Sequence, residues 1–459
     1  MSSLQRIAVI GGGPGGYTAA IRAAQRGASV VLFEREDVGG VCLNRGCIPS
    51  KALIESARLH AAAAEAARFG VRAGPVSVDW KAAQARKSAV VERLRKGVEF
   101  LLKKNKVVLK KGVARLEKPG KVVLEGPAGG EAFDADGVIL ATGSRAAVIP
   151  GLEPDGARVL DSDGILALDR VPASLAVVGG GAIGIEWACL FSALGARVEV
   201  VEILGQLVPG SDPEAAAELA RGLKKRKVGI HVSTKVEGLE KKPDGVAVRL
   251  SGGKALSVEC VLVSVGRRPW TGDALGSACG VAVDRGRVPV DAATRTNVPG
   301  VFAIGDLTGE IMLAHYASHQ GTVAAENLTG GSREVDRKAV PKCIFSDPEV
   351  AWVGYTPAEA EAAGVAVLAG SFPFRALGRA HAAEELGGFV KVLAEKESGR
   401  IVGFHVVGPR ATELVAEGTL AVKYGLTARQ LEETIHAHPT FAEAAAEAAG
   451  DVLGIAVNK

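Results

Sequence analysis

Two cysteines, Cys42 and Cys47, lie close together in the sequence with four residues between them. A zinc site needs two further ligands at matching spacing, and no other Cys or His pair provides them, so we expect no metal site. A plant-type iron–sulfur cluster needs another cysteine shortly after Cys47, where the sequence reads Ile48-Pro49-Ser50. Pro49 suits the first turn of a helix, whose dipole favours a thiolate at Cys47. These features favour a redox-active disulfide, although two inert buried cysteines remain an alternative.

A glycine-rich turn, Gly11-Gly12-Gly13-Pro14-Gly15-Gly16, predicts a dinucleotide site near the start of the chain. In such a turn Gly11 makes the tight bend, Gly13 lets a pyrophosphate approach the backbone, and Gly16 lets the helix pack on the strand. The phosphates then lie at the helix N-terminus, where N–H groups and the dipole favour an anion. Glu34 closes the following strand and is placed to accept hydrogen bonds from a ribose.

A second turn repeats this pattern, with Gly179, Gly181 and Gly184 in the three glycine positions and Glu202 at the end. Each copy spans 24 residues from its first glycine to its glutamate, so we expect two nucleotide sites. A glutamate at position 202 accepts from the ribose 2′-hydroxyl and repels a 2′-phosphate. Residues 203–209 contain no basic side chain, which favours NAD over NADP.

The elements that must hold these residues alternate between strands and helices, which predicts an α/β fold. The first unit reads as strand 6–10, helix 14–26 and strand 29–33, and the second as strand 175–178, helix 182–193 and strand 197–201. A buried strand is expected at 137–140, followed by a boundary at Pro150-Gly151. A polar stretch at 330–338 precedes strands at 389–393 and 401–407 and helices at 413–424 and 441–449, a separate α+β domain.

Length and composition fit a globular protein of several domains. The chain has 459 residues, and single cores stop growing at about 250–300 residues. Its net charge is +4, and the basic cluster at 103–111 lacks any nucleic-acid motif, so we expect a solvated face. No apolar stretch reaches the roughly 18 residues that a membrane span needs, and residues 1–5 lead into glycines rather than a signal peptide. With one close cysteine pair among six cysteines, we expect a cytoplasmic protein.

With these residues in view, the sequence resembles the pyridine nucleotide–disulfide oxidoreductase family over essentially its whole length. Ala141-Thr142-Gly143 matches a second FAD signature, and Gly300 to Asp306 matches a third. Leu313-Ala314-His315 resembles the segment whose backbone meets the flavin ring. Gly266-Arg267-Arg268-Pro269 also matches, but Trp270 stands where the family often has asparagine.

The resemblance implies two Rossmann-like domains, the first for FAD and the second for NAD, and a C-terminal α+β dimerisation domain. The implied boundaries are 1–149 for the FAD domain, 150–269 for the NAD domain, 270–338 for a segment completing the FAD domain, and 339–459 for dimerisation. The expected cofactor contacts are Gly11, Gly13, Gly16, Glu34, Lys51, Ala114, Thr142, Gly143, Asp306, Ala314, His315, Gly179, Gly181, Gly184, Glu202, Val236 and Gly266.

Catalytic roles also follow from the resemblance. It implies that Cys42 exchanges with the substrate and that Cys47 faces the flavin, while Lys51 and Glu186 meet beside the reactive flavin nitrogen. The segment from His436 to Glu443 looks like that of members that oxidise dihydrolipoamide with NAD. There His438 is the acid–base, Glu443 orients it, and His436 is neighbouring structure. In the expected homodimer, His438 serves the disulfide of the other subunit.

The expected partner is a lipoyl-bearing acyltransferase or lipoyl carrier protein of a 2-oxo acid dehydrogenase or glycine cleavage complex. No lipoyl-type domain precedes Ile7, so the lipoyl group is expected on the partner. Glu202 disfavours a glutathione reductase, and a last cysteine at Cys343 disfavours a mercuric reductase. A reductase of another small disulfide stays open. From a different class, a non-catalytic flavin-binding structural partner is disfavoured by the intact cysteine and histidine segments.

Overall fold

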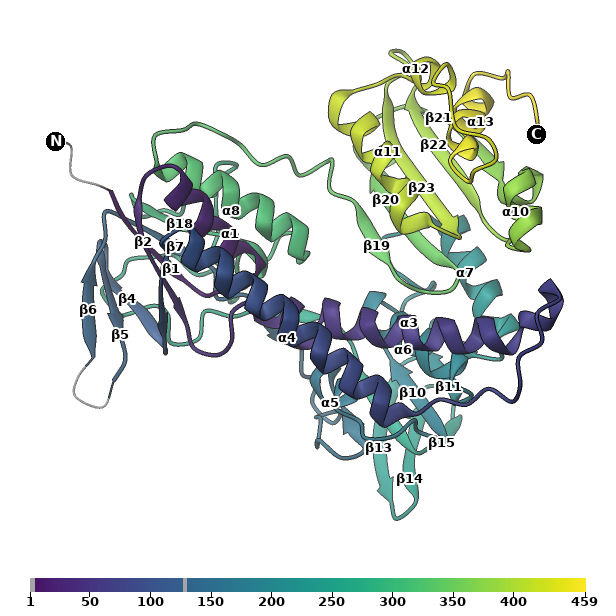
Figure 1. Ribbon diagram of the computed structural model, residues 1–459, viewed down its shortest axis with the longest axis horizontal. Helices are drawn as coiled ribbons and strands as arrows, with labels where there is room; N and C mark the ends of the chain where they lie inside the picture. The colour runs from purple at the N-terminus through teal and green to yellow at the C-terminus, as the bar shows by residue number, and fades with distance from the viewer. Residues whose placement is uncertain (1–4, 127–129) are drawn as a thin grey trace. The chain divides into compact units, whose positions relative to one another are not determined.

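The protein is described by a computed structural model of residues 5–126 and 130–459, which divides into two compact units (Figure 1). The first unit comprises Met1–Leu53, Asp79–Ala147 and Gly266–Asp336. The second comprises Ile54–Val78, Val148–Val265 and Arg337–Lys459. Each unit has its own hydrophobic cores, and each is described by itself below.

The first unit is built on a five-stranded parallel sheet in the order β18-β7-β1-β2-β3. Its strands are β1 (Arg6–Ile10), β2 (Ser29–Glu34), β3 (Val108–Lys111), β7 (Gly137–Leu140) and β18 (Val301–Ala303). The predicted strands at 6–10 and 137–140 are confirmed at their bounds, and β7 is buried along its whole length. Burial on both faces is what a parallel sheet requires of such an apolar run.

Helices and small sheets surround this parallel sheet. The helices of this unit are α1 (Pro14–Gln25), α2 (Gly40–Arg45), α4 (Trp80–Lys104) and α8 (Ala314–Leu328), with a short 3₁₀ turn at η2 (Gly305–Thr308). Helix α3 (Cys47–Ala64) begins in the first unit and continues into the residues of the second, which also include the 3₁₀ turn η1 (Ala66–Phe69). An antiparallel sheet contains β4 (Ala114–Lys118), β5 (Lys121–Leu124) and β6 (Glu131–Asp134), and β8 (Ser144–Ala146) pairs with β17 (Arg267–Pro269).

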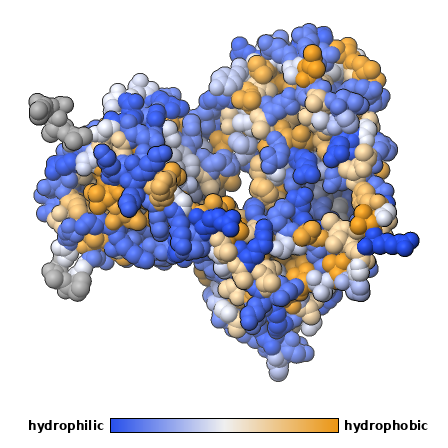
Figure 2. Space-filling model, viewed as in Figure 1, coloured by the Kyte–Doolittle hydropathy of each residue, from blue (hydrophilic) through white to orange (hydrophobic). Residues whose placement is uncertain are grey.

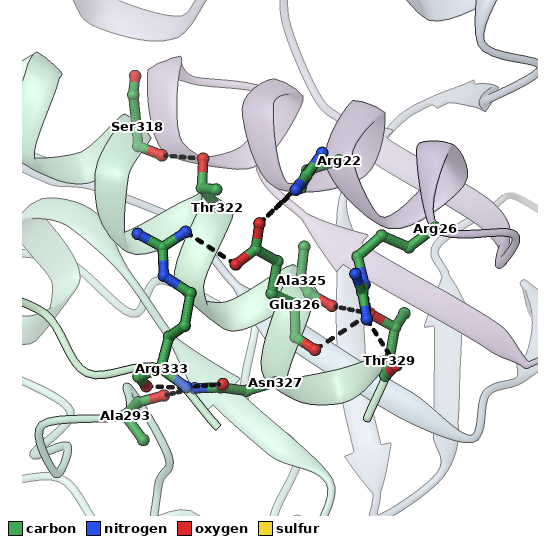
Figure 3. Close-up of polar contacts among 10 residues, drawn as sticks. All are labelled: Arg22, Arg26, Ala293, Ser318, Thr322, Ala325, Glu326, Asn327, Thr329 and Arg333. Atoms are coloured by element: carbon green, nitrogen blue, oxygen red, sulfur yellow. Dashed lines mark hydrogen bonds and ion pairs between the residues drawn. The ribbon is translucent and has the colours of Figure 1, made fainter. Parts of the chain in front are cut away.

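Helices α1 and α8 lie side by side and are joined by ion pairs on Glu326 (Figure 3). The Glu326 carboxylate accepts from Arg22 Nε and from Arg333 Nη1, both at 2.8 Å, and its side chain is largely buried. The hydrogen bond from Arg333, followed by that from Arg22, outweighs burial and lowers the pKa of Glu326. A second link runs from Arg26 Nε to Thr329 Oγ1 at 2.7 Å. These contacts fix the helix that follows the first glycine turn against the helix that begins at Ala314.

The second unit contains another five-stranded parallel sheet, in the order β12-β11-β10-β16-β9. Its strands are β9 (Val159–Leu160), β10 (Ser174–Val178), β11 (Arg197–Val201), β12 (Gly229–His231) and β16 (Cys260–Val263). Its helices are α5 (Ser162–Leu166), α6 (Ala182–Ala193) and α7 (Pro213–Lys225), and a meander is formed by β13 (Val236–Lys242), β14 (Gly245–Leu250) and β15 (Ala255–Val258).

The rest of the second unit is an antiparallel sheet with helices, which confirms the predicted fold class. The strand order is β19-β20-β23-β22-β21. The strands are β19 (Lys342–Ile344), β20 (Glu349–Gly354), β21 (Val367–Pro373), β22 (Phe389–Glu395) and β23 (Ile401–Gly408). The helices are α9 (Pro357–Ala362), α10 (Gly378–Ala383), α11 (Ala411–Tyr424), α12 (Ala428–Glu432) and α13 (Glu443–Val452), with a 3₁₀ turn at η3 (Phe374–Ala376).

A buried ion pair joins α7 to the antiparallel sheet within the second unit. Asp212 caps α7 by accepting from the backbone N–H of Glu214 at 2.8 Å, and its other oxygen accepts from Lys391 Nζ on β22 at 2.8 Å. The Asp212 side chain is fully buried and that of Lys391 is 8% exposed. Burial disfavours both charged forms, but the hydrogen bond between Asp212 and Lys391 and the contacts of each residue with Glu214 outweigh the effect of burial. The pKa of Asp212 is lowered and that of Lys391 is raised, so both stay charged near neutral pH.

Replacement of Lys391 by methionine is expected to destabilise the second unit by about 3–5 kcal/mol, because Asp212 would be left as a buried charge without its cation. Thermal unfolding followed by circular dichroism measures this as a lower Tm. Lys396→Met, an exposed lysine just beyond the same strand, is the matched control and should leave Tm nearly unchanged. Equal Tm values for the two variants would show that the buried pair does not stabilise the unit.

Candidate active site

The cysteine pair lies at the junction of two helices in the first unit. Cys42 is in α2, and Cys47 is the first residue of α3, so the predicted position of Cys47 at a helix N-terminus is confirmed. Asn44, between the cysteines, donates from Nδ2 to the carbonyl oxygens of Gly40, Val38 and Asp37 at 3.0, 3.1 and 3.2 Å. The sequence pattern assigned no role to Asn44, whose amide joins the short helix to the loop before it.

The two thiols contact each other, and their contact controls where the proton lies. The pKa of Cys42 is raised by its hydrogen bond with Cys47, by burial and by the negative charge of Cys47. The nearby cation of Lys51 acts in the opposite direction. A reduced pair of this kind therefore keeps a proton on Cys42, and a thiol with a raised pKa is a poor leaving group until it receives a proton.

Tyr17 borders the cysteine pair, although no sequence motif pointed to it. Burial, followed by the electrostatic interaction with Cys42, raises the pKa of the Tyr17 hydroxyl. The residue lies on α1, directly after the first glycine-rich turn. The redox pair and the predicted pyrophosphate site are thus neighbours in the first unit.

The two glycine-rich turns have nearly identical backbone geometry. Gly11 has φ +106° and Gly179 has φ +107°, in the left-handed region that favours glycine. A Cβ atom at Gly11 would lie 2.3 Å from the carbonyl oxygen of Ala141, and one at Gly179 would lie 2.5 Å from that of Ser264. Apart from its chain neighbours, no residue in the described part of the chain has an atom within 4 Å of a Cβ placed on Gly181, so this turn has open space where a pyrophosphate would approach.

The two glutamates at the ends of the repeats are also held alike. Glu34 accepts from the backbone N–H groups of Gly12 and Glu36 at 2.7 and 2.8 Å. Glu202 accepts from those of Gly180 and Leu204 at the same two distances. Each carboxylate is fixed at the carboxyl end of a strand, and its oxygens retain lone pairs for a ribose hydroxyl. This arrangement fits an adenosine ribose in each unit.

A polar network holds Asp306, the residue matched to the third FAD signature. Ser144 Oγ donates to Asp306 Oδ2, and Arg267 Nε donates to Ser144 Oγ at 2.7 Å. The backbone N–H of Gly305 donates to buried Gln320 Oε1 on α8 at 2.7 Å. Thus strand β8, strand β17 and helix α8 all position the turn that carries Asp306. No sequence motif pointed to Ser144 or Gln320, which contact this turn from distant parts of the chain.

His438 and Glu443 form a dyad in the second unit. Glu443 Oε1 lies 2.9 Å from His438 Nδ1, and Oε2 accepts from the backbone N–H of Thr440 at 2.8 Å. Burial opposes the Glu443 charge, but these hydrogen bonds outweigh it and lower the pKa of Glu443. The His438 side chain is 76% exposed. With Nδ1 bonded to a carboxylate, Nε2 is the ring nitrogen that presents a lone pair for proton transfer.

His436 has different surroundings from His438. Its Nε2 lies 2.8 Å from Glu417 and its Nδ1 lies 2.8 Å from the carbonyl oxygen of Thr434. The hydrogen bond with Glu417 raises the pKa of His436, and the side chain is largely buried. Both ring nitrogens are therefore engaged in holding the loop that precedes the dyad.

The remaining predicted residues are placed as follows. Glu186 is buried on α6 and accepts from the backbone N–H of Phe345 at 3.1 Å. It belongs to the second unit and Lys51 to the first, so their pairing stays a prediction. Three of the others are the first residues of their elements: β4 begins at Ala114, β13 at Val236 and α8 at Ala314, with His315 next in α8. The turn after β7 contains Thr142 and Gly143, and Gly266 directly precedes β17.

Residues 5–126 and 130–459 include no helix that is both long and apolar enough to cross a bilayer. Within the same described ranges, no three His, Cys, Asp or Glu side chains gather in a way that would hold a metal ion.

Comparisons with known proteins point in one direction. Residues 5–321 match the family model described as pyridine nucleotide-disulphide oxidoreductase, and residues 340–449 match the dimerisation domain of the same family. A dihydrolipoyl dehydrogenase of Geobacillus stearothermophilus is 42% identical over 98% of this chain and 96% of its own length. One from Haloferax volcanii is 43% identical over the same shares of the two chains.

Solved structures agree with this result. The crystal structure of LpdA from Mycobacterium tuberculosis superposes with a TM-score of 0.91 at 28% identity, covering 97% of this chain and 99% of that one. RclA, an HOCl-induced flavoprotein disulfide reductase from Escherichia coli, gives a TM-score of 0.86 at 27% identity, with the same coverage.

Proposed function

Because this chain belongs to the pyridine nucleotide-disulphide oxidoreductase family, we propose that it catalyses the dihydrolipoyl dehydrogenase reaction, oxidising a dihydrolipoyl group with reduction of NAD⁺. One observation carries the proposal. A single chain combines a pair of contacting thiols with an exposed histidine that is hydrogen-bonded to a carboxylate. Relatives that carry the name dihydrolipoyl dehydrogenase match the chain along nearly its full length.

The residues of the two units fit FAD and NAD. The first unit offers the turn at Gly11 to Gly16, the carboxylate of Glu34 and the network around Asp306. The second offers the open turn at Gly181 and the fixed carboxylate of Glu202. FAD, if held by these residues of the first unit, would supply a two-electron acceptor for the thiol pair and a hydride donor for NAD⁺. The protein contributes binding, orientation and proton transfer.

The thiol chemistry follows from the cysteine pair. A dihydrolipoyl thiolate attacks the Cys42 sulfur of the disulfide, a mixed disulfide forms, and Cys47 leaves as a thiolate. The second substrate thiol then attacks the substrate sulfur of the mixed disulfide, which releases lipoamide and frees Cys42. His438 removes the proton of the first substrate thiol and returns it to Cys42, whose raised pKa favours protonation as it departs. The imidazole then takes the proton of the second substrate thiol, and the Cys47 thiolate keeps the negative charge. Glu443 keeps the imidazole in the tautomer that presents Nε2.

The proposed assembly is a homodimer in which His438 serves the partner's disulfide. Residues 340–449 match a dimerisation domain. Within this range, Leu420 and Tyr424 on α11 and Ile435 just after α12 are 58%, 72% and 97% exposed, an apolar set suited to a protein contact. Hydrophilic residues dominate the face drawn in Figure 2, with hydrophobic residues in smaller groups.

The proposed electron donor is a lipoyl group on an acyltransferase or carrier protein, and the proposed location is the cytoplasm.

The Glu202 carboxylate should decide nicotinamide nucleotide selectivity. Glu202→Gln removes the charged acceptor for the ribose, so we expect the KM for NAD⁺ to rise about 10-fold or more. Discrimination against NADP⁺ should relax in the same variant. Glu34→Gln is the matched control because the first unit holds Glu34 in the same geometry. With saturating FAD it should leave the KM for NAD⁺ unchanged, and a wild-type preference for NADP⁺ would contradict the role given to Glu202.

The activity itself is tested by steady-state reduction of NAD⁺ with dihydrolipoamide beside other dithiols. We expect dihydrolipoamide to give the highest kcat/KM. A higher value with another small dithiol would identify a related disulfide reductase instead.

A further inference from the structure

Trp270 is a contact point for three separate segments of the first unit. The guanidinium carbon of Arg35 lies 4.4 Å from the centroid of the Trp270 ring, and that of Arg145 lies 3.9 Å from it. Arg35 directly follows Glu34 at the end of β2, Arg145 is in β8, and Trp270 directly follows β17. A tryptophan ring attracts guanidinium groups through its quadrupole, so one side chain holds two cations that would otherwise repel each other.

The backbone of Trp270 is fixed to the second FAD signature. Its N–H donates to the carbonyl oxygen of Gly143 at 3.0 Å, and its own carbonyl accepts from Thr142 Oγ1 at 2.6 Å. A Cβ atom at Gly272 would lie 2.2 Å from the indole ring, and Gly272 has φ +52°. The absence of a side chain at Gly272 thus leaves space for the indole ring, which packs directly against the backbone of that residue.

The contact continues from Trp270 toward the redox segment. Arg35 Nη2 lies 3.1 Å from Glu36 Oε1, and Arg45 Nη1 lies 2.7 Å from Glu36 Oε2. Arg45 is the last residue of α2, between the two cysteines. One continuous set of contacts therefore runs from the ring through Arg35 and Glu36 to the helix that carries Cys42.

We propose that Trp270 is a positioning residue for FAD. It sets the spacing between the Glu34 end of β2 and the Thr142–Gly143 turn before the cofactor binds. The preformed site binds FAD more tightly, and releases it more slowly, than a site without the ring would. Preorganisation of this kind lowers the ordering cost of binding. Asparagine, frequent at this position in the family, has no aromatic face and leaves Arg35 and Arg145 without their common contact. The inference depends on the proposed function only in taking FAD as the cofactor.

The test measures FAD binding rather than turnover. Apoprotein is titrated with FAD, and the release rate of FAD from holoenzyme is followed by flavin fluorescence. Trp270→Asn is expected to raise the Kd for FAD about 10-fold and to speed release, since both cation–π contacts are lost. Trp270→Phe keeps an aromatic face and should retain most of the affinity, while Arg35→Gln and Arg145→Gln should each give a partial loss. Arg93→Gln, an exposed arginine on α4, is the matched control.

Unchanged FAD affinity and release in Trp270→Asn would overturn the proposal. An equal loss in Trp270→Asn, Trp270→Phe and Arg93→Gln would overturn it too, because it would reflect general damage to the unit. The Kd of each variant for NAD⁺, whose proposed site lies in the second unit, shows whether the rest of the chain is folded. If wild-type protein failed to oxidise dihydrolipoamide but the FAD series behaved as expected, the proposed substrate would be wrong and the role of Trp270 would stand.

Discussion

His438→Ala is expected to lower kcat with dihydrolipoamide by about 10²–10⁴-fold while FAD stays bound. The loss follows because the variant has no base for the substrate thiol and no acid for Cys42, whose raised pKa makes an unprotonated departure costly. Stopped-flow reduction of the flavin by dihydrolipoamide measures the effect directly. His381→Ala, an exposed histidine in the same unit, is the control and should retain wild-type rates. A small loss in His438→Ala would remove His438 from the mechanism.

Glu443→Gln separates orientation from proton transfer. The amide keeps a hydrogen-bonding group beside His438 Nδ1 but no longer stabilises an imidazolium. We expect a smaller loss of kcat than in His438→Ala and a displaced pH–rate profile. An unchanged profile would leave Glu443 with a structural role only.

The location of His438 across a dimer interface has its own test. Subunits carrying His438→Ala are mixed with subunits carrying Cys47→Ser, and exchange is confirmed by separating tagged heterodimers. If the sites are shared, each heterodimer contains one site with both wild-type halves, and activity returns. An inactive heterodimer would mean that each chain builds its own site.

Cys42→Ser and Cys47→Ser are each expected to reduce turnover with dihydrolipoamide to background, the largest effect of any single change. A serine oxygen cannot form the disulfide, so the thiol chemistry has no electron acceptor. FAD content and reduction of the flavin by NADH should persist, because that step does not use the disulfide. Cys343→Ser replaces a cysteine far from the pair in sequence and should keep activity. Substantial turnover in either serine variant would contradict the assigned redox pair.

Local sequence predicted the parallel sheets and their glycine turns well, for a physical reason. The turns at Gly11 and Gly179 need positive φ and close backbone approach, which glycine accommodates. Residue type and spacing therefore suffice to predict these turns from the sequence. The helix at 182–193 and the strand at 197–201 were predicted at their bounds. The helix predicted at 441–449 instead begins at Glu443, whose side chain is hydrogen-bonded to Thr440.

Other parts of the site have no recognisable local pattern in the sequence. Ser144 and Arg267 meet Asp306 only because β8 and β17 pair across more than a hundred residues of sequence. The position of Trp270 was visible only as a departure from the family, and its contacts with Arg35 and Arg145 depend on tertiary structure. Long-range pairings of this kind are set by the fold as a whole, which periodicity and composition do not encode.

Anaerobic mixing of FAD-loaded enzyme with dihydrolipoamide, first alone and then with NAD⁺, is the most direct test of the proposed reaction. We expect the substrate to change the flavin spectrum within the turnover time and NAD⁺ to reverse the change with formation of NADH, and we expect Cys47→Ser to show neither. A flavin that stays oxidised with dihydrolipoamide but is reduced by a different dithiol would contradict it.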